Sequence, residues 1–416
     1  MSATKSYAID KWSVYNAYKA VKANAGAAGV DRQSLADFEA DLSSNLYKIW
    51  NRMSSGSYFP PAVKAVAIPK KSGGERILGI PTVADRVAQM VVKREIEPAI
   101  EASFAPDSYG YRPGKSALDA VGITRERCWR YDWVLEFDIK GLFDNIDQEL
   151  LRKALRKHVH CEWASLYIER WLTAPMQLAD GTQEIRSRGT PQGGVVSPLL
   201  ANLFMHYAFD LWMGRTFPGA PWCRYADDGL VHCRTEHEAL ALRDALEKRF
   251  RECGLEMHPV KTKIVYCKDG KRRRQYPNTQ FDFLGYTFRP RLVKNRKRNS
   301  MFVNFTPAVS QAAMKSMRQT TRRLNYRNRS NLSLADISRL HNPILRGWLA
   351  YYGRFYPSAM YPVLRHFNRT LVAWAMKKFK RLKGRKMRTS QFLKTLAKTR
   401  PSLFVHWQRG MVGDFA

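Results

Sequence analysis

The chain has 416 residues, of which 45% are hydrophobic, enough for two or three domains with cores of their own. No apolar run approaches the roughly 20 residues of a membrane-spanning helix, and the first residues lack the apolar core of a signal peptide. None of the six cysteines forms a Cys-x-x-Cys pair, which argues against a zinc ribbon and suits a reducing cytoplasm.

The positive charge is concentrated in the C-terminal part of the sequence. Residues 291–416 hold 28 Lys and Arg residues and two acids, a net charge of +26, which leaves +8 of the total of +34 for residues 1–290. Such a segment either binds a polyanion or forms a disordered basic tail. Its aromatic residues, Trp348, Trp374 and Trp407 among them, are too many for an unfolded tail. We therefore expect a folded basic domain that binds nucleic acid, either RNA or single strands, and no membrane.

Helices and strands alternate up to residue 290 in the predicted structure. In chain order they are a helical region at 8–55, strands at 62–69 and 76–80, a helix at 83–104, a strand at 131–139, helices at 147–158 and 196–213, a hairpin around Asp227, a helix at 235–253, and strands at 262–267 and 281–288. After Pro290 the pattern is mostly helical, with basic linkers at 294–298 and 327–330.

The segment Tyr225-Ala-Asp-Asp-Gly229 places two adjacent carboxylates between runs that can form strands. Asp-Asp-Gly suits the tip of a tight hairpin, where both side chains can approach one cation although strand residues normally alternate between faces. Two neighbouring anions repel each other, so a bound cation is one reason for the pair. The alternative is a solvated turn, because Asp and Gly are ordinary turn residues.

A third carboxylate, Asp138, ends an apolar strand that leads into a helix. A carboxylate at a strand end, together with a carboxylate pair on a nearby hairpin, is a layout that holds two divalent cations for phosphoryl transfer. Mg²⁺ suits such a site because it needs few carboxylates and keeps positions for substrate phosphates. The alternative is that Asp138 caps the following helix.

These segments resemble, in order, the motifs of reverse transcriptases. Residues 137–147 and 225–228, with Gly189-Thr-Pro-Gln-Gly-Gly194 between them, look like the polymerase palm. Further matches at 29–31, 50–58, 78–87, 107–114, 281–288 and 342–352 resemble bacterial group II intron-encoded reverse transcriptase/maturases. The resemblance implies an α+β right-hand polymerase, with fingers and palm of antiparallel sheet plus helices and an α-helical thumb. The implied domains are an N-terminal extension at 1–60, fingers and palm at 61–290, and a basic thumb/maturase domain at 291–416.

The implied activity is that of an RNA-directed DNA polymerase, a nucleotidyltransferase, of a group II intron. Such a protein also binds the intron RNA and assists splicing and retrohoming. The implied partners are the intron RNA, an RNA template with a DNA primer, target DNA and dNTPs. We expect a cytoplasmic bacterial protein associated with the nucleoid or with a ribonucleoprotein.

Three further points qualify the implied function. The family often continues into an HNH endonuclease, but no Cys/His cluster follows residue 350, so we expect no target-strand cleavage and a primer from a replication fork or elsewhere. One alternative is a domesticated reverse transcriptase in phage defence or linked to a CRISPR system. The other is a splicing cofactor that acts mainly by binding RNA.

The resemblance also implies roles for single residues. Asp138, Asp227 and Asp228 would be catalytic and, with Ile139, would hold two Mg²⁺ ions. Lys70 and Arg76, which flank a glycine turn, would neutralise the triphosphate of the incoming dNTP, although they could also be a solvated turn.

Three more residues would bind the dNTP. Phe143 would exclude a 2′-hydroxyl, unless it is a core aromatic. Gln192 would pack under the nucleotide, where the neighbouring glycines allow close backbone approach. Lys261 would lie near the triphosphate, unless it is a strand-edge lysine.

The RNA contacts are expected in a basic run in which eight of the twelve residues from Lys377 to Arg388 are Lys or Arg. Such contacts give affinity without sequence readout and weaken with salt. The alternative, a solvated helix face, is poorly supported because no acids balance the charge. The residues expected to bind RNA are Arg346, Lys377, Lys378, Lys380, Arg381, Lys383, Arg385 and Lys386.

Overall fold

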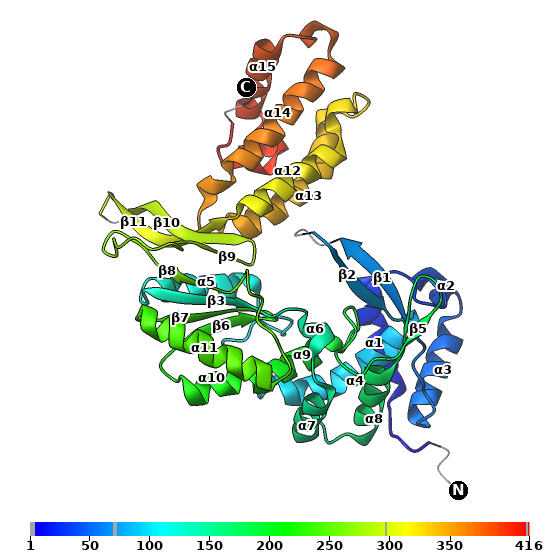
Figure 1. The fold of residues 1–416 in the computed structure, drawn as a ribbon. Coiled ribbons are helices and arrows are strands. Elements are labelled where there is room, and N and C mark those ends of the chain that lie inside the picture. The colour runs from blue at the N-terminus through cyan, green and yellow to red at the C-terminus, as the bar shows by residue number, and fades with distance from the viewer. Residues whose placement is uncertain (1–4, 70–72, 296–297, 413–414, 416) are drawn as a thin grey trace. The chain divides into compact units, whose positions relative to one another are not determined.

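The computed structural model describes residues 5–69, 73–295, 298–412 and 415. The chain divides into two compact units (Figure 1). The N-terminal unit comprises Met1–Ala120 and Leu135–Ile264, and the C-terminal unit comprises Val121–Val134 and Val265–Ala416. Residues 265–290 therefore group with the basic C-terminal stretch. No helix among the described residues is long and apolar enough to cross a membrane.

The predicted helical region at 8–55 is three helices, α1 (Lys11–Asn24), α2 (Leu35–Ala40) and α3 (Leu42–Ser54). The first break follows Asn24, where Ala25 and Gly26 both take positive φ. Ser34 then starts α2 with a capping box, because its hydroxyl accepts from Asp37 and the Asp37 carboxylate accepts from its backbone. Helices α1 and α3 pack against α4 (Val83–Glu101), whose buried valines form the centre of this bundle.

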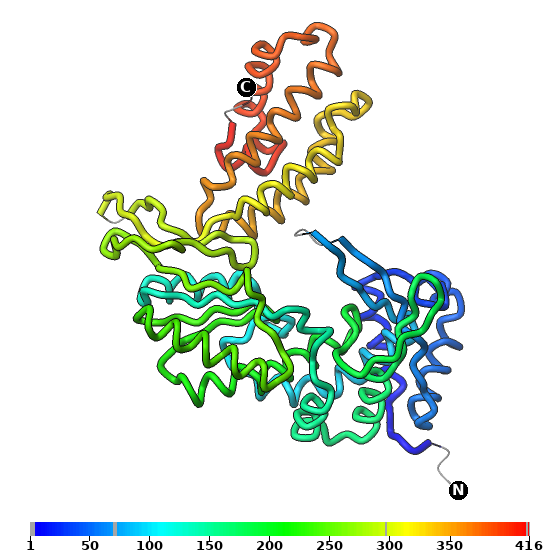
Figure 2. The backbone as a smooth tube through the Cα atoms, in the orientation of Figure 1, coloured from blue at the N-terminus to red at the C-terminus, as the bar shows by residue number. Residues whose placement is uncertain are grey.

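A four-stranded sheet follows, in the order β2-β1-β4-β5. Figure 2 traces the backbone of this part of the chain. The predicted strands near 62–69 and 76–80 are confirmed as the antiparallel pair β1 and β2, with Ala67 opposite Ile77. Strand β4 runs parallel to β1 and pairs with β5. The strand bounds are β1 (Val63–Pro69), β2 (Glu75–Ile80), β4 (Met176–Gln177) and β5 (Gln183–Glu184).

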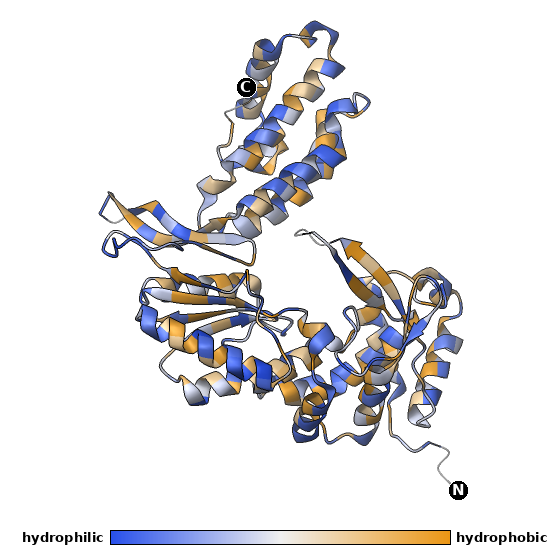
Figure 3. Ribbon diagram, viewed as in Figure 1, coloured by the Kyte–Doolittle hydropathy of each residue, from blue (hydrophilic) through white to orange (hydrophobic). Residues whose placement is uncertain are grey.

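The second sheet, in the order β6-β7-β3-β8, carries the predicted carboxylates. Its strands are β6 (Trp222–Tyr225), β7 (Asp228–Cys233), β3 (Trp133–Asp138) and β8 (Lys263–Tyr266). The hairpin around Asp227 is confirmed, with Tyr225 paired to Asp228. A Cβ on Gly229 would lie 2.1 Å from the Phe137 ring, so the residue after the carboxylate pair has to be glycine. Apolar residues run along these strands, as Figure 3 shows.

The helices between β2 and β8, besides α4, are α5 (Ala117–Cys128), α6 (Leu142–Asn145), α7 (Gln148–His158), α8 (Glu162–Thr173), α9 (Ser197–Met205), α10 (Leu211–Thr216) and α11 (Glu236–Glu252). Of these, α7 and α8 pack against α4. The predicted helix at 196–213 is interrupted by a π-helical segment, η1 (His206–Asp210). The rings of Phe209 on η1, Phe137 on β3 and Phe250 on α11 pack within 6.2 Å of one another, which fixes η1 and α11 to the sheet.

The C-terminal unit begins with a sheet in the order β11-β10-β9, formed by β9 (Phe281–Phe283), β10 (Tyr286–Asn295) and β11 (Ser300–Val309). The prediction of mostly helix after Pro290 is wrong up to residue 309. Met301-Phe-Val-Asn-Phe-Thr306 is rich in β-branched and aromatic residues, which favour strand, and β11 pairs with β10 along its whole length. Part of the predicted linker at 294–298 is therefore the end of a hairpin.

Beyond the hairpin, helices surround a core that contains Phe367, Trp374 and Trp407. The helices are α12 (Gln311–Leu324), α13 (Leu334–Tyr352), α14 (Tyr361–Lys378), α15 (Lys386–Thr399) and α16 (Val405–Gln408), with short 3₁₀ turns η2 (Tyr326–Asn328), η3 (Pro357–Met360), η4 (Lys380–Leu382) and η5 (Pro401–Leu403). The helical prediction is confirmed for this part.

A fully buried ion pair fixes the β6–β7 hairpin. Arg224 on β6 donates from Nε and Nη2 to the two carboxylate oxygens of Asp210, at 2.8 and 2.7 Å. Its guanidinium also donates to Asn202 Oδ1, Ser108 Oγ and the carbonyl oxygen of Ala226. Both charged side chains are completely buried, so each depends on the other for its partner.

Replacement of Asp210 by Asn should leave the Arg224 charge buried without a counter-charge. We expect the free energy of unfolding to fall by about 3–5 kcal/mol. Urea unfolding would measure the change. The matched control is Asp244→Asn, which breaks an exposed Arg243–Asp244 pair and should change stability by less than about 1 kcal/mol. Equal effects of the two substitutions would contradict a structural role for the buried pair.

Candidate active site

Three carboxylates meet at the edge of the β6-β7-β3-β8 sheet. Asp138 is the last residue of β3, Asp228 is the first residue of β7, and Asp227 lies in the two-residue turn between β6 and β7. Ala226, the first residue of this turn, has a φ of 58°, as the first central residue of a primed hairpin turn requires. Asp138 does not cap the next helix, because the residue in the cap position of α6 is Gly141.

The three carboxylates are close enough to change one another's protonation. Burial and then the charge of Asp227 raise the pKa of Asp228 to about 8, with further contributions from a hydrogen bond to Asp138 and from its charge. Burial also raises the pKa of Asp227, and the charge of Asp138 adds to this effect. Crowded carboxylates of this kind are stabilised by a cation.

Lys261 supplies one cation. Its Nζ lies 2.9 Å from Asp138 Oδ2. Burial lowers the pKa of Lys261, but the hydrogen bond and the charges of the three carboxylates outweigh burial and raise it. Lys261 precedes β8 and lies in a turn that is fixed to the site, since the backbone N–H of His258 donates to the carbonyl oxygen of Asp138 at 2.7 Å.

The chemistry of these groups fits a hard divalent cation, because all three acids offer oxygen ligands and none is fully paired. Within the described ranges, no group of three or more His, Cys, Asp or Glu side chains is arranged so that it could hold a metal ion. The fit therefore rests on the raised pKa values and on the contact between Asp138 and Lys261, which show that this edge of the sheet favours positive charge.

A cavity of about 860 Å³ adjoins the carboxylates. Of the predicted site residues, it brings together Asp138, Ile139, Asp227, Arg76, Gln192 and Lys261. Lys70 lies outside the described residues. Asp228 and Phe143 are not part of the wall, although Asp138 contacts the first and α6 carries the second.

The loop with Gln192 is locked in place by its backbone. The N–H of Gly79 on β2 donates to the carbonyl oxygen of Gln192 at 2.7 Å, and a Cβ on Gly193 would lie 2.5 Å from the Gly79 carbonyl oxygen. The N–H of Thr190 donates to the carbonyl oxygen of Phe143 at 2.7 Å. Gly193 therefore allows the loop to lie close against β2, and the contact of Gln192 with a nucleotide stays a prediction.

Phe143 is half-buried and packs against other aromatic rings. Its ring meets the ring of Tyr111 edge-on at 6.4 Å, and Tyr111 lies 6.4 Å from Tyr225 beside the carboxylate pair. This position leaves part of the Phe143 ring accessible, so both of its predicted roles stay open.

The sequence does not single out Arg186, which also lines the cavity. Its side chain is half-buried, burial lowers the pKa of its guanidinium, and Nη2 is buried without a hydrogen-bond partner. A cation in this state is suited to an anionic ligand. The sequence offers one indication of this role. Arg186 lies on the connection that follows β5, three residues before Gly189 at the start of the Gly-Thr-Pro-Gln motif.

The basic run of the C-terminal unit is a bent connection and not one helix face. It passes from the end of α14 through η4 to the start of α15. Lys378 differs from its neighbours, because its ammonium donates to the carbonyl oxygens of Ser330 and Leu332 at 2.8 and 2.9 Å. The other expected RNA contacts are exposed, namely Arg346, Lys377, Lys380, Arg381, Lys383, Arg385 and Lys386.

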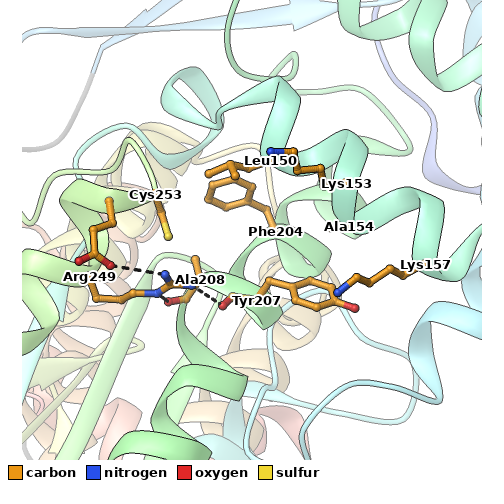
Figure 4. A pocket seen from close by; sticks show the side chains of 10 residues that line it. Leu150, Lys153, Ala154, Lys157, Phe204, Tyr207, Ala208, Arg249 and Cys253 are labelled. Carbon is orange, nitrogen blue, oxygen red and sulfur yellow. Dashed lines mark hydrogen bonds and ion pairs between the residues drawn. The ribbon is translucent and has the colours of Figure 1, made fainter.

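A second, smaller cavity of about 200 Å³ lies between α7, α9, η1 and α11, and Figure 4 shows its lining. Arg249 crosses one side and donates to the carbonyl oxygens of Tyr207 and Ala208. None of the predicted site residues is part of its described lining.

Comparison with known families gives two matches in series. Residues 68–288 match the family "Reverse transcriptase (RNA-dependent DNA polymerase)", and residues 314–392 match the "Group II intron, maturase-specific domain". Protein YkfC of Escherichia coli is 31% identical over 316 residues, which are 65% of this chain and 77% of that protein. The group II intron-encoded protein LtrA of Lactococcus lactis is 34% identical over 195 residues, 46% of this chain but only 32% of LtrA.

Among solved structures, telomerase from Candida albicans in complex with a fragment of telomeric RNA aligns with a TM-score of 0.46 and 13% identity. The alignment covers 90% of this chain and 67% of the telomerase chain. At this score the similarity carries no argument about function. The family matches do, because the first spans more than half of the sequence and contains the three carboxylates, and the maturase match follows it in the basic unit. On these grounds the chain belongs to the group II intron-encoded reverse transcriptase/maturases.

Proposed function

We propose that Asp138, Asp227 and Asp228 hold two Mg²⁺ ions at which this RNA-directed DNA polymerase extends a primer. The reaction is attack of the primer 3′-hydroxyl on the α-phosphate of a dNTP, with release of pyrophosphate. The observation that carries the proposal is the meeting of three carboxylates, from β3 and the β6–β7 turn, beside a cavity of about 860 Å³.

The ligand set would consist of the carboxylates of Asp138, Asp227 and Asp228 and the backbone oxygen of Ile139. Two divalent ions at such a site activate the attacking hydroxyl and stabilise the leaving oxygen. Burial contributes as well, because it strengthens electrostatic interactions between the carboxylates and a cation. The buried Arg224 holds the turn that presents Asp227 through its hydrogen bond to the Ala226 carbonyl oxygen.

The basic residues on the cavity wall would bind the triphosphate of the incoming dNTP. Arg76 offers a planar fork that fits phosphate oxygens, and Lys261 offers a point charge beside the carboxylates. Gln192 would lie under the nucleotide, on a loop that is fixed to β2. Lys261 is also placed to give a proton to the leaving pyrophosphate, since its ammonium lies 2.9 Å from Asp138 Oδ2 on the wall of the cavity.

The C-terminal unit would bind the intron RNA, and through it assist splicing and retrohoming. Two observations support this role: the net charge of +26 over residues 291–416 and the match of residues 314–392 to the maturase-specific domain. An RNA template with a DNA primer, and target DNA, would be the other polyanionic partners. The acidic site and the basic unit then carry separate parts of the function.

Asp227→Asn should abolish primer extension while it leaves RNA binding intact. The loss should be at least about a thousandfold, because metal-ion stabilisation of the transition state is worth several kcal/mol. Primer extension on an RNA template with Mg²⁺ and dNTPs measures it. The fold should survive, since the substitution removes one of three crowded negative charges.

Asp244→Asn, on the exposed face of α11, is the control and should extend primers normally. Splicing of the intron RNA by the Asp227→Asn protein should also persist, because the basic unit is unchanged. Full extension activity in the Asp227→Asn variant would overturn the two-metal assignment.

The raised pKa of Asp228 predicts a link between pH, Mg²⁺ and stability. Between pH about 4 and about 8 the folded metal-free protein keeps a proton that the unfolded chain has released, so the free energy of unfolding falls as pH rises through this window. Mg²⁺ displaces this proton, so it should raise the unfolding temperature more at pH 8 than at pH 6. Thermal unfolding with Mg²⁺ or with EDTA measures the difference.

Asp228→Asn provides the comparison for the pH experiment, because an amide does not titrate. The extra stabilisation by Mg²⁺ at pH 8 should largely disappear in this variant. A wild-type protein whose response to Mg²⁺ is the same at both pH values would argue against Asp228 as the titrating ligand.

Phe143→Val tests whether the aromatic ring excludes ribonucleotides. If the ring lies against the sugar, its loss should raise the use of rNTPs relative to dNTPs by about 10- to 100-fold, the usual range for a steric pocket. The ratio of kcat/KM for a matched rNTP and dNTP measures the effect. An unchanged ratio together with a lower unfolding temperature would instead identify Phe143 as a core residue.

A further inference from the structure

The C-terminal unit contains a hollow of about 580 Å³ that none of the predicted residues except Lys377 touches. It is built where the end of α12 and the turn η2 pack against α14 (Figure 1). Its lining includes Arg322, Arg327, Asn328, His366, Arg369 and Lys377.

The charge of this hollow is uniformly positive. Three arginines and Lys377 line it, and no carboxylate does. The sequence holds only two acids after residue 290, and of these Asp336 is within the described ranges. Asp336 is already engaged, since it accepts from the backbone and hydroxyl of Ser333 and pairs with Arg339. Among the described residues after 290, no acid therefore lines the hollow or offers it a counter-charge.

The polar groups of the hollow are held in fixed positions. Lys377 Nζ donates to Asn328 Oδ1 at 2.6 Å, and Asn328 Nδ2 donates to Asn325 Oδ1 at 2.9 Å. Asn325 ends α12 in the left-handed conformation, with its N–H on the carbonyl oxygen of Arg322. These bonds orient the Lys377 ammonium before any ligand arrives, which lowers the entropic cost of binding.

One polar atom in the wall lacks a partner. His366 Nε2 is buried and makes no hydrogen bond within the described structure. Burial lowers the pKa of His366, and the charges of Arg322, Arg318 and Arg369 lower it further, so several cations converge on this ring. A buried donor or acceptor without a partner costs free energy that a bound polar ligand would recover.

We propose that this hollow is a binding site for a backbone phosphate of RNA. The volume exceeds what one inorganic anion fills and lies in the range of nucleotide-sized ligands. Arginine forks give directional bonds to phosphate oxygens, and a hollow can surround an anion as a convex basic surface does not. Lys377 belongs to both the hollow and the basic run, so a polyanion seated in the hollow continues along that run.

The proposal rests on the RNA-binding function proposed above and assigns one contact with the RNA backbone to this hollow. The basic run attracts RNA through unspecific charge, which weakens steeply with salt. The hollow would fix one point of the RNA backbone and set its register on the unit, as phosphate contacts do in other nucleic-acid complexes. The two contributions can be separated by comparing arginines inside and outside the hollow.

The test compares Arg369→Gln, inside the hollow, with Arg388→Gln, an exposed arginine of the basic run on α15. Both remove one charge from the same unit of the full chain. Affinity for a single-stranded RNA oligonucleotide is measured at 150 mM salt. We expect about tenfold weaker binding for Arg369→Gln, because it loses charged hydrogen bonds to the phosphate. For Arg388→Gln, which loses only unspecific attraction, we expect about two- to threefold weaker binding. Arg369→Lys keeps the charge but not the fork, and should restore affinity only in part.

Inorganic phosphate is the second probe. At matched ionic strength, phosphate should displace RNA from the wild-type protein more effectively than chloride does. In Arg369→Gln the two anions should displace RNA equally. Unchanged unfolding temperatures exclude a folding defect. If the two Gln variants weaken RNA binding equally, or if Arg369→Lys binds RNA as tightly as the wild type, the phosphate site is overturned but the RNA-binding function is not. No RNA binding by the wild type would overturn the RNA-binding function and the site with it.

Discussion

The geometry of the site depends on the buried pair of Arg224 and Asp210. The turn that presents Asp227 contains Ala226 with a positive φ of 58°, a conformation that costs a residue with a side chain about 1–2 kcal/mol. Arg224 compensates, because its guanidinium binds the Ala226 carbonyl oxygen while Asp210 holds it from the π-helical segment. Buried ion pairs add little net stability in general, so the role of this one is to fix a single backbone geometry.

Each unit of the protein carries a charge imbalance of its own. In the N-terminal unit, three carboxylates meet and force the pKa of Asp228 up to about 8, with Lys261 as a partial counter-charge. In the C-terminal unit the imbalance has the opposite sign, and the hollow beside α14 has no carboxylate in its wall. Such imbalances lower the stability of the free protein. The ligands proposed above, a divalent cation for the first and a polyanion for the second, would balance these charges.

Local features of the site could be predicted from sequence, and features that depend on packing could not. The β6–β7 hairpin and the strand that ends at Asp138 follow from short apolar runs and a tight turn, which act over a few residues. In the sequence Arg224 looks like an ordinary strand residue. Only the tertiary packing of the π-helical segment brings its partner Asp210 to it. For the same reason the composition of the basic run cannot separate Lys378, which holds two backbone carbonyls, from neighbours that face solvent. Strand β11 is different, because the β-branched and aromatic residues at 301–306 are a local strand signal that the prediction of helix after Pro290 did not use.

The separation of chemistry from RNA recognition has a consequence for specificity. A divalent cation and a triphosphate are common to every nucleotide, so the carboxylate site cannot select which RNA is copied. Phosphate contacts in the basic unit carry no base readout either. The amides of Asn325 and Asn328, which could read a base edge, are joined to each other and to Lys377. Selection of one RNA by these residues therefore has to come from its shape, through the spacing between the points where its backbone is held.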